Sequence, residues 1–489
     1  MTVKEVFLIR DESRLTITPA LPELEALLTY EKKVMEQDPE KPWIRKTKKL
    51  KKPAFRIKEG TENEPKVMMT FQGFWKKVQT FLESRGYKVT IKDMRLPFPA
   101  PKLQYMSGFR FSQQGLLTTC LNQNDSGLLG APTRYGKTTL MINTIRAYPV
   151  MTVVTAPGED LIRQLYEDIK EKCPHRHVVL IGAGSKVRYP SDDITVCSMD
   201  SLSKCDVDRT RLLLIDEPHA AVTDSRLPMI NSFHKARRIG FGATLKGRYD
   251  NRDVLIEGLI GPVLAERTYL EAVAEGAICP LVVLMLNVKI SKGDYKSTWK
   301  RDKAYKNLIY ESPRIASITR KICHEIIPAK WQTLFFIKNE AQADHYIEYI
   351  GHEGTIAMAK KMNKAERLET MERMKSGEIL RCLASDIYSQ GVTFPDVRAL
   401  VNIGGGGANT TTIQKPGRLA EVRPNKKCGV VFDFFFVADD DINPFSMGES
   451  RMILYDSVSR RKAYLEKGYK VVDVSTFSEL KKAFETECL

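Results

Sequence analysis

The chain has 489 residues, enough for about three domains with hydrophobic cores of their own. Its hydrophobic content of 43% and charged content of 28% are those of a soluble globular protein, and no run approaches the roughly 20 apolar residues that cross a bilayer. Its 76 Lys and Arg against 60 Asp and Glu give a formal net charge of +16, which favours a polyanionic partner. The 9 cysteines show no paired C-x-x-C spacing and no secretory signal precedes them, so we expect reduced thiols in a cytoplasmic protein.

The first hundred residues predict a small accessory domain that contacts nucleic acid. Positive charge is concentrated between Trp43 and Lys58, and phosphate contact is its natural use. The residues expected to make that contact are Arg45, Lys46, Lys48 and Lys49. The apolar spacing from Phe71 to Leu82 predicts a helix that ends near Gly86, with Trp75 and Phe81 in the core. Leu96–Pro101 has the composition of a linker.

A phosphate-binding loop follows at Ala131–Thr139, between an apolar run at Gly127–Leu129 and a helical pattern that begins at Thr138. Such a loop presents the free N–H groups of the helix start to an anion. Gly136 allows the backbone to approach phosphates, Lys137 neutralises their charge and the Thr138 hydroxyl is a ligand for Mg²⁺. The substrate and cofactor that this loop predicts are ATP and Mg²⁺.

Two predicted strand ends between this loop and the next motif are candidates for nucleic-acid contact. The strand at Met151–Ala156 leads through Pro157 into a helix that includes Gln164, and a second strand at Ile194–Ser198 ends in hydroxyl groups. Hydroxyls at such positions can bind phosphate oxygens.

A buried strand at Leu212–Ile215 ends in Asp216 and Glu217. The carboxyl end of such a strand faces the crevice where α/β sheets bind ligands. Asp216 is expected to hold Mg²⁺, Glu217 to orient or deprotonate the attacking water, and His219 to sense the nucleotide. A further strand at Ile239–Gly242 leads to Thr244, which we expect to couple hydrolysis to domain motion near the nucleic acid.

The second half repeats the alternation of strands and helices and predicts a second parallel sheet, with strands at Thr333–Ile337 and Ala399–Ile403. Gly404–Gly407 is interpreted as a turn, because no Lys-Thr and no helical pattern follow it. Gln414 and Arg418 are predicted to open a helix from which an arginine reaches a γ-phosphate.

These motifs, in this order over roughly residues 105–440, resemble those of superfamily two helicases. The resemblance implies an α/β fold of two tandem RecA-like parallel-sheet domains with a small α+β N-terminal accessory domain. It also implies that Gln113 or its neighbour Gln114 reads adenine. The residues predicted to bind the nucleotide are Gln113, Thr133, Gly136, Lys137, Thr138, Thr139 and Gly391.

Within that superfamily the chain is similar to the phage UvsW-type branch-migration helicases, which implies a monomer that acts on branched or forked DNA. The domains expected are 1–100 (DNA recognition), 101–270 (ATP-binding), 271–440 (second RecA-like domain) and 441–489 (helical extension, with a basic aromatic helix from Arg451 to Tyr469). Three alternatives stay open: a duplex-DNA translocase of the restriction or remodelling kind, an RNA helicase, and a DNA-binding protein with a weak motor.

The chain departs from the helicase pattern at Glu421, where the family has a second arginine. Arg423 can replace that arginine if the predicted helix is shifted in register; otherwise Arg418 acts alone. Thr393 stands where many helicases use Asp to contact the ribose.

Overall fold

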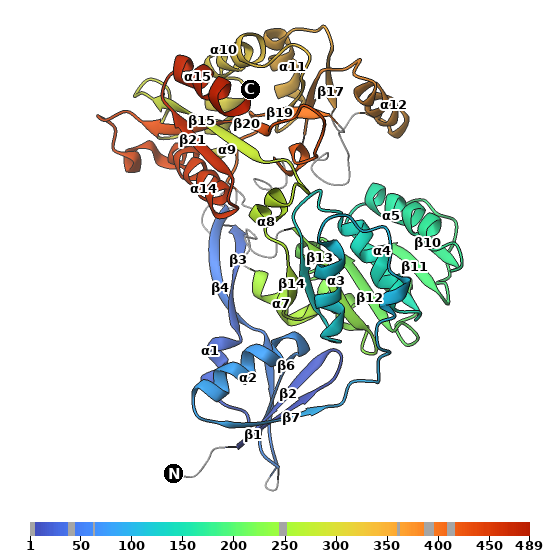
Figure 1. The fold of residues 1–489 in the computed structure, drawn as a ribbon. Coiled ribbons are helices and arrows are strands. Elements are labelled where there is room, and N and C mark those ends of the chain that lie inside the picture. Colours follow the sequence, from blue (N-terminus) through green and yellow to red (C-terminus); the bar gives the residue numbers. More distant parts are fainter. Residues whose placement is uncertain are drawn as a thin grey trace. The chain divides into compact units, whose positions relative to one another are not determined.

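The computed structural model describes residues 5–37, 45–61, 64–243, 252–358, 362–385, 396–407 and 416–489. Figure 1 shows its helices and strands in chain order of colour, and its internal contacts divide the chain into two units. Unit 1 comprises Met1–Pro132 and Gly136–Thr268, and unit 2 comprises Thr133–Tyr135 and Tyr269–Leu489.

Unit 1 begins with a five-stranded sheet in the order β5-β6-β2-β1-β7. Its strands are β1 (Glu5–Arg10), β2 (Arg14–Thr18), β5 (Phe55–Lys58), β6 (Val67–Phe71) and β7 (Lys88–Asp93). Burial alternates along β1 and β2, because successive side chains point to opposite faces of a strand. One face packs on α1 (Glu23–Leu27) and α2 (Trp75–Ser84) and forms the core of this domain. A two-stranded hairpin, β3 (Thr29–Gln37) and β4 (Arg45–Pro53), is inserted between β2 and β5.

The predicted helix from Phe71 begins later than expected. Phe71 is the last residue of β6, where it pairs with Arg14, and a short 3-10 turn, η1 (Gln72–Phe74), separates it from α2. Gly86 follows α2 with a φ of 79°. The predicted core positions of Trp75 and Phe81 are confirmed, since both pack against the core of unit 1.

The accessory domain is joined firmly to the rest of unit 1 through η1 and α7 (Asp253–Ile260). A Cβ on Gly258 would lie 2.5 Å from Cζ of Phe74, and one on Gly73 would collide with the carbonyl oxygen of Glu257. Two ion pairs also join the domains: Arg10 Nη2 and Arg95 Nη1 lie 3.0 and 2.5 Å from Oδ1 of Asp125, which precedes β8. The segment around Leu96 has no regular structure, as expected of a linker. The backbone N–H of Leu96 donates to Glu12 Oε1 at 2.7 Å, and this hydrogen bond holds the segment against the accessory domain.

The rest of unit 1 is a seven-stranded sheet in the order β10-β11-β9-β12-β13-β8-β14, with every strand parallel to its neighbours. Its strands are β8 (Gly127–Gly130), β9 (Thr152–Ala156), β10 (Val178–Ile181), β11 (Ile194–Ser198), β12 (Leu212–Asp216), β13 (Arg237–Gly242) and β14 (Val263–Glu266). Its helices include α3 (Gln113–Asn122), α4 (Lys137–Ala147), α5 (Glu159–Lys172) and α6 (Arg226–Asn231), besides α7. Every residue of β8, β9, β12 and β13 is buried, because both faces of such a sheet are covered.

Unit 2 contains a second seven-stranded sheet, in the order β17-β18-β16-β19-β20-β15-β21, which is also parallel. Its strands are β15 (Leu281–Ile290), β16 (Gln332–Phe336), β17 (Thr355–Met358), β18 (Arg381–Ala384), β19 (Val397–Asn402), β20 (Gly429–Ala438) and β21 (Lys470–Val474). Its helices are α8 (Tyr269–Ala274), α9 (Arg301–Tyr305), α10 (Pro313–Lys321), α11 (Glu340–Ile350), α12 (Lys364–Lys375), α14 (Met452–Glu466) and α15 (Phe477–Cys488). The predicted pair of tandem parallel-sheet domains is therefore present.

The C-terminal residues differ from the expected helical extension. β21 pairs with β15 and completes the second sheet, and α14 packs on β20. Arg460 and Tyr464 of α14 are buried and both bind Asp433, so these residues of the predicted basic aromatic helix are part of the core.

All nine cysteines are buried thiols. Across the described part of the chain, no helix combines the length and apolar character needed to span a membrane.

Candidate nucleotide-binding site

The loop between β8 and α4 has the backbone of an anion-binding turn. Gly136, the residue before α4, has a φ of 94° and a ψ of 42°, a left-handed conformation that glycine adopts at little cost. Arg134 also has a positive φ, 73°, which is uncommon for a residue with a side chain. The loop thereby turns the chain so that the N-terminus of α4 opens at the carboxyl edge of the sheet.

Gln113 lies directly against this turn, as the sequence predicts for a nucleotide-contacting residue. A Cβ on Gly136 would lie 2.5 Å from Nε2 of Gln113, so a side chain at this position would have to displace the amide. The backbone N–H of Arg110 donates to Gln113 Oε1 at 2.8 Å and orients the amide. Gln114, the alternative candidate, is exposed, whereas Gln113 is buried, which favours Gln113.

The structure brings the predicted lysine and acidic residues together. Glu217 Oε1 lies 3.4 Å from Lys137 Nζ, and Glu217 Oε2 lies 3.3 Å from Nδ1 of His219. Only β13 lies between β8 and β12 in the sheet, so the start of α4 and the end of β12 share one edge. Glu217 itself has a φ of 50°, a strained conformation of the kind that concentrates at functional sites.

The two adjacent carboxyl groups have pKa values shifted in opposite directions. Burial and the neighbouring Glu217 raise the pKa of Asp216. Burial also opposes ionisation of Glu217, but Lys137 and His219 outweigh it, so the pKa of Glu217 is lowered. Two adjacent carboxyl groups whose pKa values are shifted in opposite directions are typical of sites of acid–base and metal chemistry.

The residues present fit a divalent cation. Asp216 Oδ1 is buried and accepts no hydrogen bond from any residue that the structure describes. A cation would satisfy that oxygen and remove the cost of ionising a buried carboxyl group. Thr138, at the second position of α4, is half-buried on the same edge of the sheet, as are Thr133 in the loop and Thr139. Asp216 and Thr138 are therefore the residues that would hold Mg²⁺, which when bound neutralises phosphate charge.

The candidate nucleic-acid residues of unit 1 lie at the same edge of the sheet. Ser198 pairs with Ala156, so Pro157 and Ser198 leave neighbouring strands side by side. Gln164 is exposed on α5. Thr244 lies outside the described residues.

The sequence analysis did not identify a third member of this edge, the loop after β10. Gly182, Ala183 and Gly184 have consecutive φ values of 92°, 53° and 73°. Such a run of left-handed residues turns backbone N–H groups into one concavity, which suits an anion. The hydroxyls of Ser198 and Ser201 lie beside it, 3.0 Å from each other. The available signal was the Gly-Ala-Gly that directly follows the apolar run Val178–Ile181.

In unit 2 the segment around Arg418 is not the expected helix. It forms a single 3-10 turn, η8 (Pro416–Leu419), and then continues without regular structure to β20. A shifted helical register therefore cannot place Arg423 where the family has its second arginine. Arg423 Nη2 instead lies 2.6 Å from Glu421 Oε1. Arg418 is half-buried, and Gln414 and Gly391 lie outside the described residues.

Gly404–Gly407, interpreted from the sequence as a turn, follows β19 as a bend without regular structure, and Gly405 and Gly406 have positive φ values of 60° and 86°. Arg460 Nη1 donates to the carbonyl oxygen of Gly406 at 2.7 Å.

The residues of the accessory domain predicted to contact phosphates lie on β4, which pairs with β3. There Lys48 and Lys49 are exposed, and Lys49 Nζ lies 3.3 Å from Glu31 Oε2; Arg45 and Lys46 are the first residues of that strand.

Two family descriptions match the chain in succession. Residues 91–247 match "Type III restriction enzyme, res subunit", and residues 318–422 match "Helicase conserved C-terminal domain". The chain is a superfamily two helicase.

Its relatives include a helicase-like protein, number 22, of Sulfolobus islandicus filamentous virus, with 22% identity over 79% of this helicase and 75% of that protein. DNA 3'-5' translocase XPB2 of Sulfurisphaera tokodaii is 23% identical over 60% of this chain and 74% of its own. Among solved structures, the Type ISP restriction-modification enzyme LlaBIII bound to DNA has a TM-score of 0.53 at 12% identity, covering 84% of this helicase and 35% of that enzyme. T4 UvsW covers 96% of the helicase and 99% of its own chain at 14% identity, with a TM-score of 0.42.

Proposed function

We propose that this superfamily two helicase is a DNA-dependent ATPase that remodels branched DNA, by moving along one strand and drawing duplex arms past a junction. The observation that supports it best is the cluster of Lys137, Asp216, Glu217 and His219 beside the Gly136 turn, in which Asp216 and His219 are buried and the other two half-buried. That cluster supplies the phosphate-binding cation, the metal ligand and the base that hydrolysis of a nucleoside triphosphate needs.

Each side chain has a distinct role in the proposed reaction. Lys137 binds the β- and γ-phosphates and Gln113 selects adenine. Glu217, ionised because its pKa is lowered, orients and deprotonates the attacking water. His219 holds Glu217 in place, and Arg418 of unit 2 stabilises charge on the transferred phosphoryl group; an arginine of this kind contributes about 10³- to 10⁵-fold in rate.

DNA is proposed as the substrate because the relatives include the DNA translocase XPB2, and the accessory domain has a strongly basic hairpin that can contact phosphates. Strand β4 alone contains the run Lys48, Lys49, Lys51 and Lys52, all exposed. Since this domain is packed against the first parallel sheet through η1 and α7, it can hold one duplex arm while the motor acts on a strand of another.

The test is steady-state ATP hydrolysis by the full chain with no nucleic acid, single-stranded DNA, linear duplex, a model fork, a four-way junction or RNA, at matched phosphate concentration. Strongest stimulation by the fork or the junction is expected. Replacement of Lys137 by Ala should abolish hydrolysis and leave DNA binding intact. Strongest stimulation by RNA, or turnover retained by the Lys137→Ala variant, would overturn the proposal.

A second candidate is a duplex-DNA translocase without preference for branches. It is favoured by the restriction-enzyme family match over residues 91–247 and by the translocase XPB2 among the relatives. Equal stimulation by linear duplex and by junctions, together with displacement of a third strand from a triplex, would select it.

A further inference from the structure

The N-terminal sheet has a second face that neither of the described helices of the accessory domain, α1 and α2, covers. The side chains of β1 that point to the core, Val6 and Leu8, are fully buried, whereas Phe7 and Ile9 on the other face are 46% and 37% exposed. Large exposed apolar side chains grouped on one surface indicate a binding site more often than scattered ones do.

Strand register shows how this open face is arranged. One cross-strand row runs through Arg56, Met69, Thr16, Ile9 and Lys92, each paired with the next. With strands about 4.8 Å apart, the row spans roughly 19 Å. It has a cation at each end and apolar or hydroxyl groups between them. In the next row on one side Phe7 pairs with both Thr18 and Thr90.

The charges on the open face are almost all positive. Its basic side chains are Arg14, Arg56, Lys58, Lys88 and Lys92, and its acidic side chain is Glu5, which is bound to Lys88 at 2.7 Å. Within the described chain, no carboxylate pairs with Arg14, Arg56 or Lys92. A surface with a positive border and an aromatic centre complements a strand that has phosphates on one side and bases on the other.

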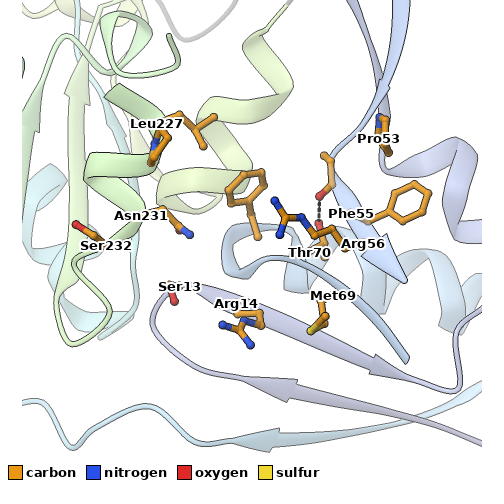
Figure 2. A pocket seen from close by; sticks show the side chains of 13 residues that line it. Ser13, Arg14, Pro53, Phe55, Arg56, Met69, Thr70, Leu227, Asn231 and Ser232 are labelled. Atoms are coloured by element: carbon orange, nitrogen blue, oxygen red, sulfur yellow. Dashed lines mark hydrogen bonds between the residues drawn. The ribbon is translucent and has the colours of Figure 1, made fainter. Parts of the chain in front are cut away.

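At the β5–β6–β2 side the open face continues into a groove of about 690 Å³ (Figure 2). Arg14, Arg56, Met69 and Phe71 line it from the sheet, and Asn231, with its neighbours in α6, lines it from the first parallel-sheet domain. In this view the guanidinium group of Arg56 points toward α6, and Arg14 lies on β2 at the edge of the groove (Figure 2). The groove therefore adds polar donors from a second domain to the basic edge.

We propose that the open face of the N-terminal sheet, with the adjoining groove, binds single-stranded DNA. Phe7 and Ile9 offer a platform for unstacked bases, and Arg14, Arg56 and Lys92 bind the backbone phosphates on both sides. An intact duplex would leave Phe7 unused, because its bases are already stacked on one another. This inference rests on the proposed function and refines it: the accessory domain holds the strand released at a branch, while the hairpin is left to the duplex arm.

The test uses the full chain without nucleotide and a fluorescent dT oligonucleotide, with binding followed by anisotropy across a salt series. Phe7→Ala should weaken binding by about five- to hundredfold, the effect of losing one stacking platform. The double change Arg14→Gln and Arg56→Gln should lower the salt slope by about 1.4, since each phosphate contact to a single strand contributes about 0.7. An oligonucleotide containing 5-bromodeoxyuridine should crosslink under ultraviolet light to the peptide that contains Phe7.

Two controls match these changes. Phe445→Ala removes a side chain of unit 2 that is 71% exposed, and Lys481→Gln with Lys482→Gln removes two exposed charges on α15; none should alter binding. Wild-type affinity in the Phe7 and arginine variants, with the crosslink elsewhere, would overturn the sheet-face proposal. The proposal would also be overturned if these variants lost binding to duplex DNA but kept binding to the single-stranded oligonucleotide, because the sheet face would then be a duplex-binding site.

The same preparations separate this proposal from the function on which it rests. If DNA stimulates hydrolysis and the variants bind the oligonucleotide like the wild type, the proposed function stands and the sheet-face site fails. If no DNA stimulates hydrolysis while Phe7→Ala abolishes the crosslink, the binding site stands and the motor assignment fails.

Discussion

At the scale of single residues, the nucleotide site depends on close contacts between side chains from different elements. Gly136 combines a left-handed backbone with close approach to Gln113, and Glu217 is held between Lys137 and His219. Each of these residues is defined by its neighbours as much as by its own chemistry, so conservative substitutions should have large effects.

Gly136→Ala should reduce ATP affinity by at least tenfold, because the added methyl group costs about 1–2 kcal/mol in the left-handed region and meets Gln113 Nε2 at 2.5 Å. Fluorescent nucleotide titration measures this directly. Gly86→Ala is the control, since that residue has a φ of 79° with nothing within 4 Å of its Cβ. Unchanged affinity in the single variant would contradict the loop geometry.

Lys426 makes the stability of unit 2 depend on pH. Its ammonium group donates to the carbonyl oxygens of Val397 and Leu419, at 2.8 and 2.7 Å, and burial lowers its pKa to about 8. Between that value and the usual 10.5 the unfolded chain holds the proton more tightly. The free energy of unfolding should therefore rise with pH across this window, with no slope from this group below pH 8.

Urea denaturation between pH 8 and 10 tests this effect. Lys426→Met should flatten the slope, whereas Lys427→Met, at an exposed neighbour, should keep it. Equal slopes in the two variants would show that Lys426 does not titrate in this range. Lys426→Met should also slow ATP hydrolysis, because Lys426 ties η8, and with it Arg418, to the start of β19.

At the scale of elements, α14 is fixed to the second sheet by one buried ion pair. Arg460 binds both oxygens of Asp433, at 2.9 and 3.1 Å, and the hydroxyl of Tyr464 donates to Asp433 Oδ2 at 2.8 Å. Arg460→Ala should cost about 3–5 kcal/mol, since it leaves a buried carboxylate unpaired. Arg460→Met combined with Asp433→Asn should recover much of that loss. Thermal unfolding of unit 2 measures both, and Arg461→Ala, at a half-exposed neighbour, should change little.

The sequence predicts an element correctly when residues close together in the chain determine it, and incorrectly when contacts between distant residues do. The buried strand predicted at Leu212–Ile215 lies within one residue of the bounds that the structure shows, Leu212–Asp216, because a local apolar run determines it. Phe71 has the spacing of a helix, but its pairing with Arg14 makes it a strand residue. Arg418 resembles a helix start, but the clamp from Lys426 to Leu419 holds a single turn instead. Contacts between distant residues decided both cases.

The candidate site shows the same division. Lys137, Asp216, Glu217 and His219 were identified from local motifs, and the structure brings them together. The open face of the N-terminal sheet was not identified, because its basic and apolar residues come from five strands that are far apart in sequence. Only the strand order places Arg56 and Lys92 at the two ends of one row.

At the scale of the whole molecule, the two units should be separable. The fragment of residues 1–268 contains the N-terminal sheet, the first parallel sheet and the contacts between them. It should unfold cooperatively and bind single-stranded DNA, but hydrolyse ATP at most slowly, because Arg418 lies in unit 2. Circular dichroism, anisotropy and steady-state hydrolysis measure the three properties. A fragment without a cooperative transition would show that unit 1 needs unit 2 to fold.

The tight fit between η1 and α7 has a consequence for how this helicase can be altered. Neither Gly73 nor Gly258 can take a methyl group without moving backbone or the ring of Phe74. The two elements lie far apart in sequence, and each is shaped to the other. A chimera that receives a new N-terminal domain must therefore also receive a matching α7. Likewise, a substitution that replaces Gly73 or Gly258 requires a compensating substitution in the element packed against it.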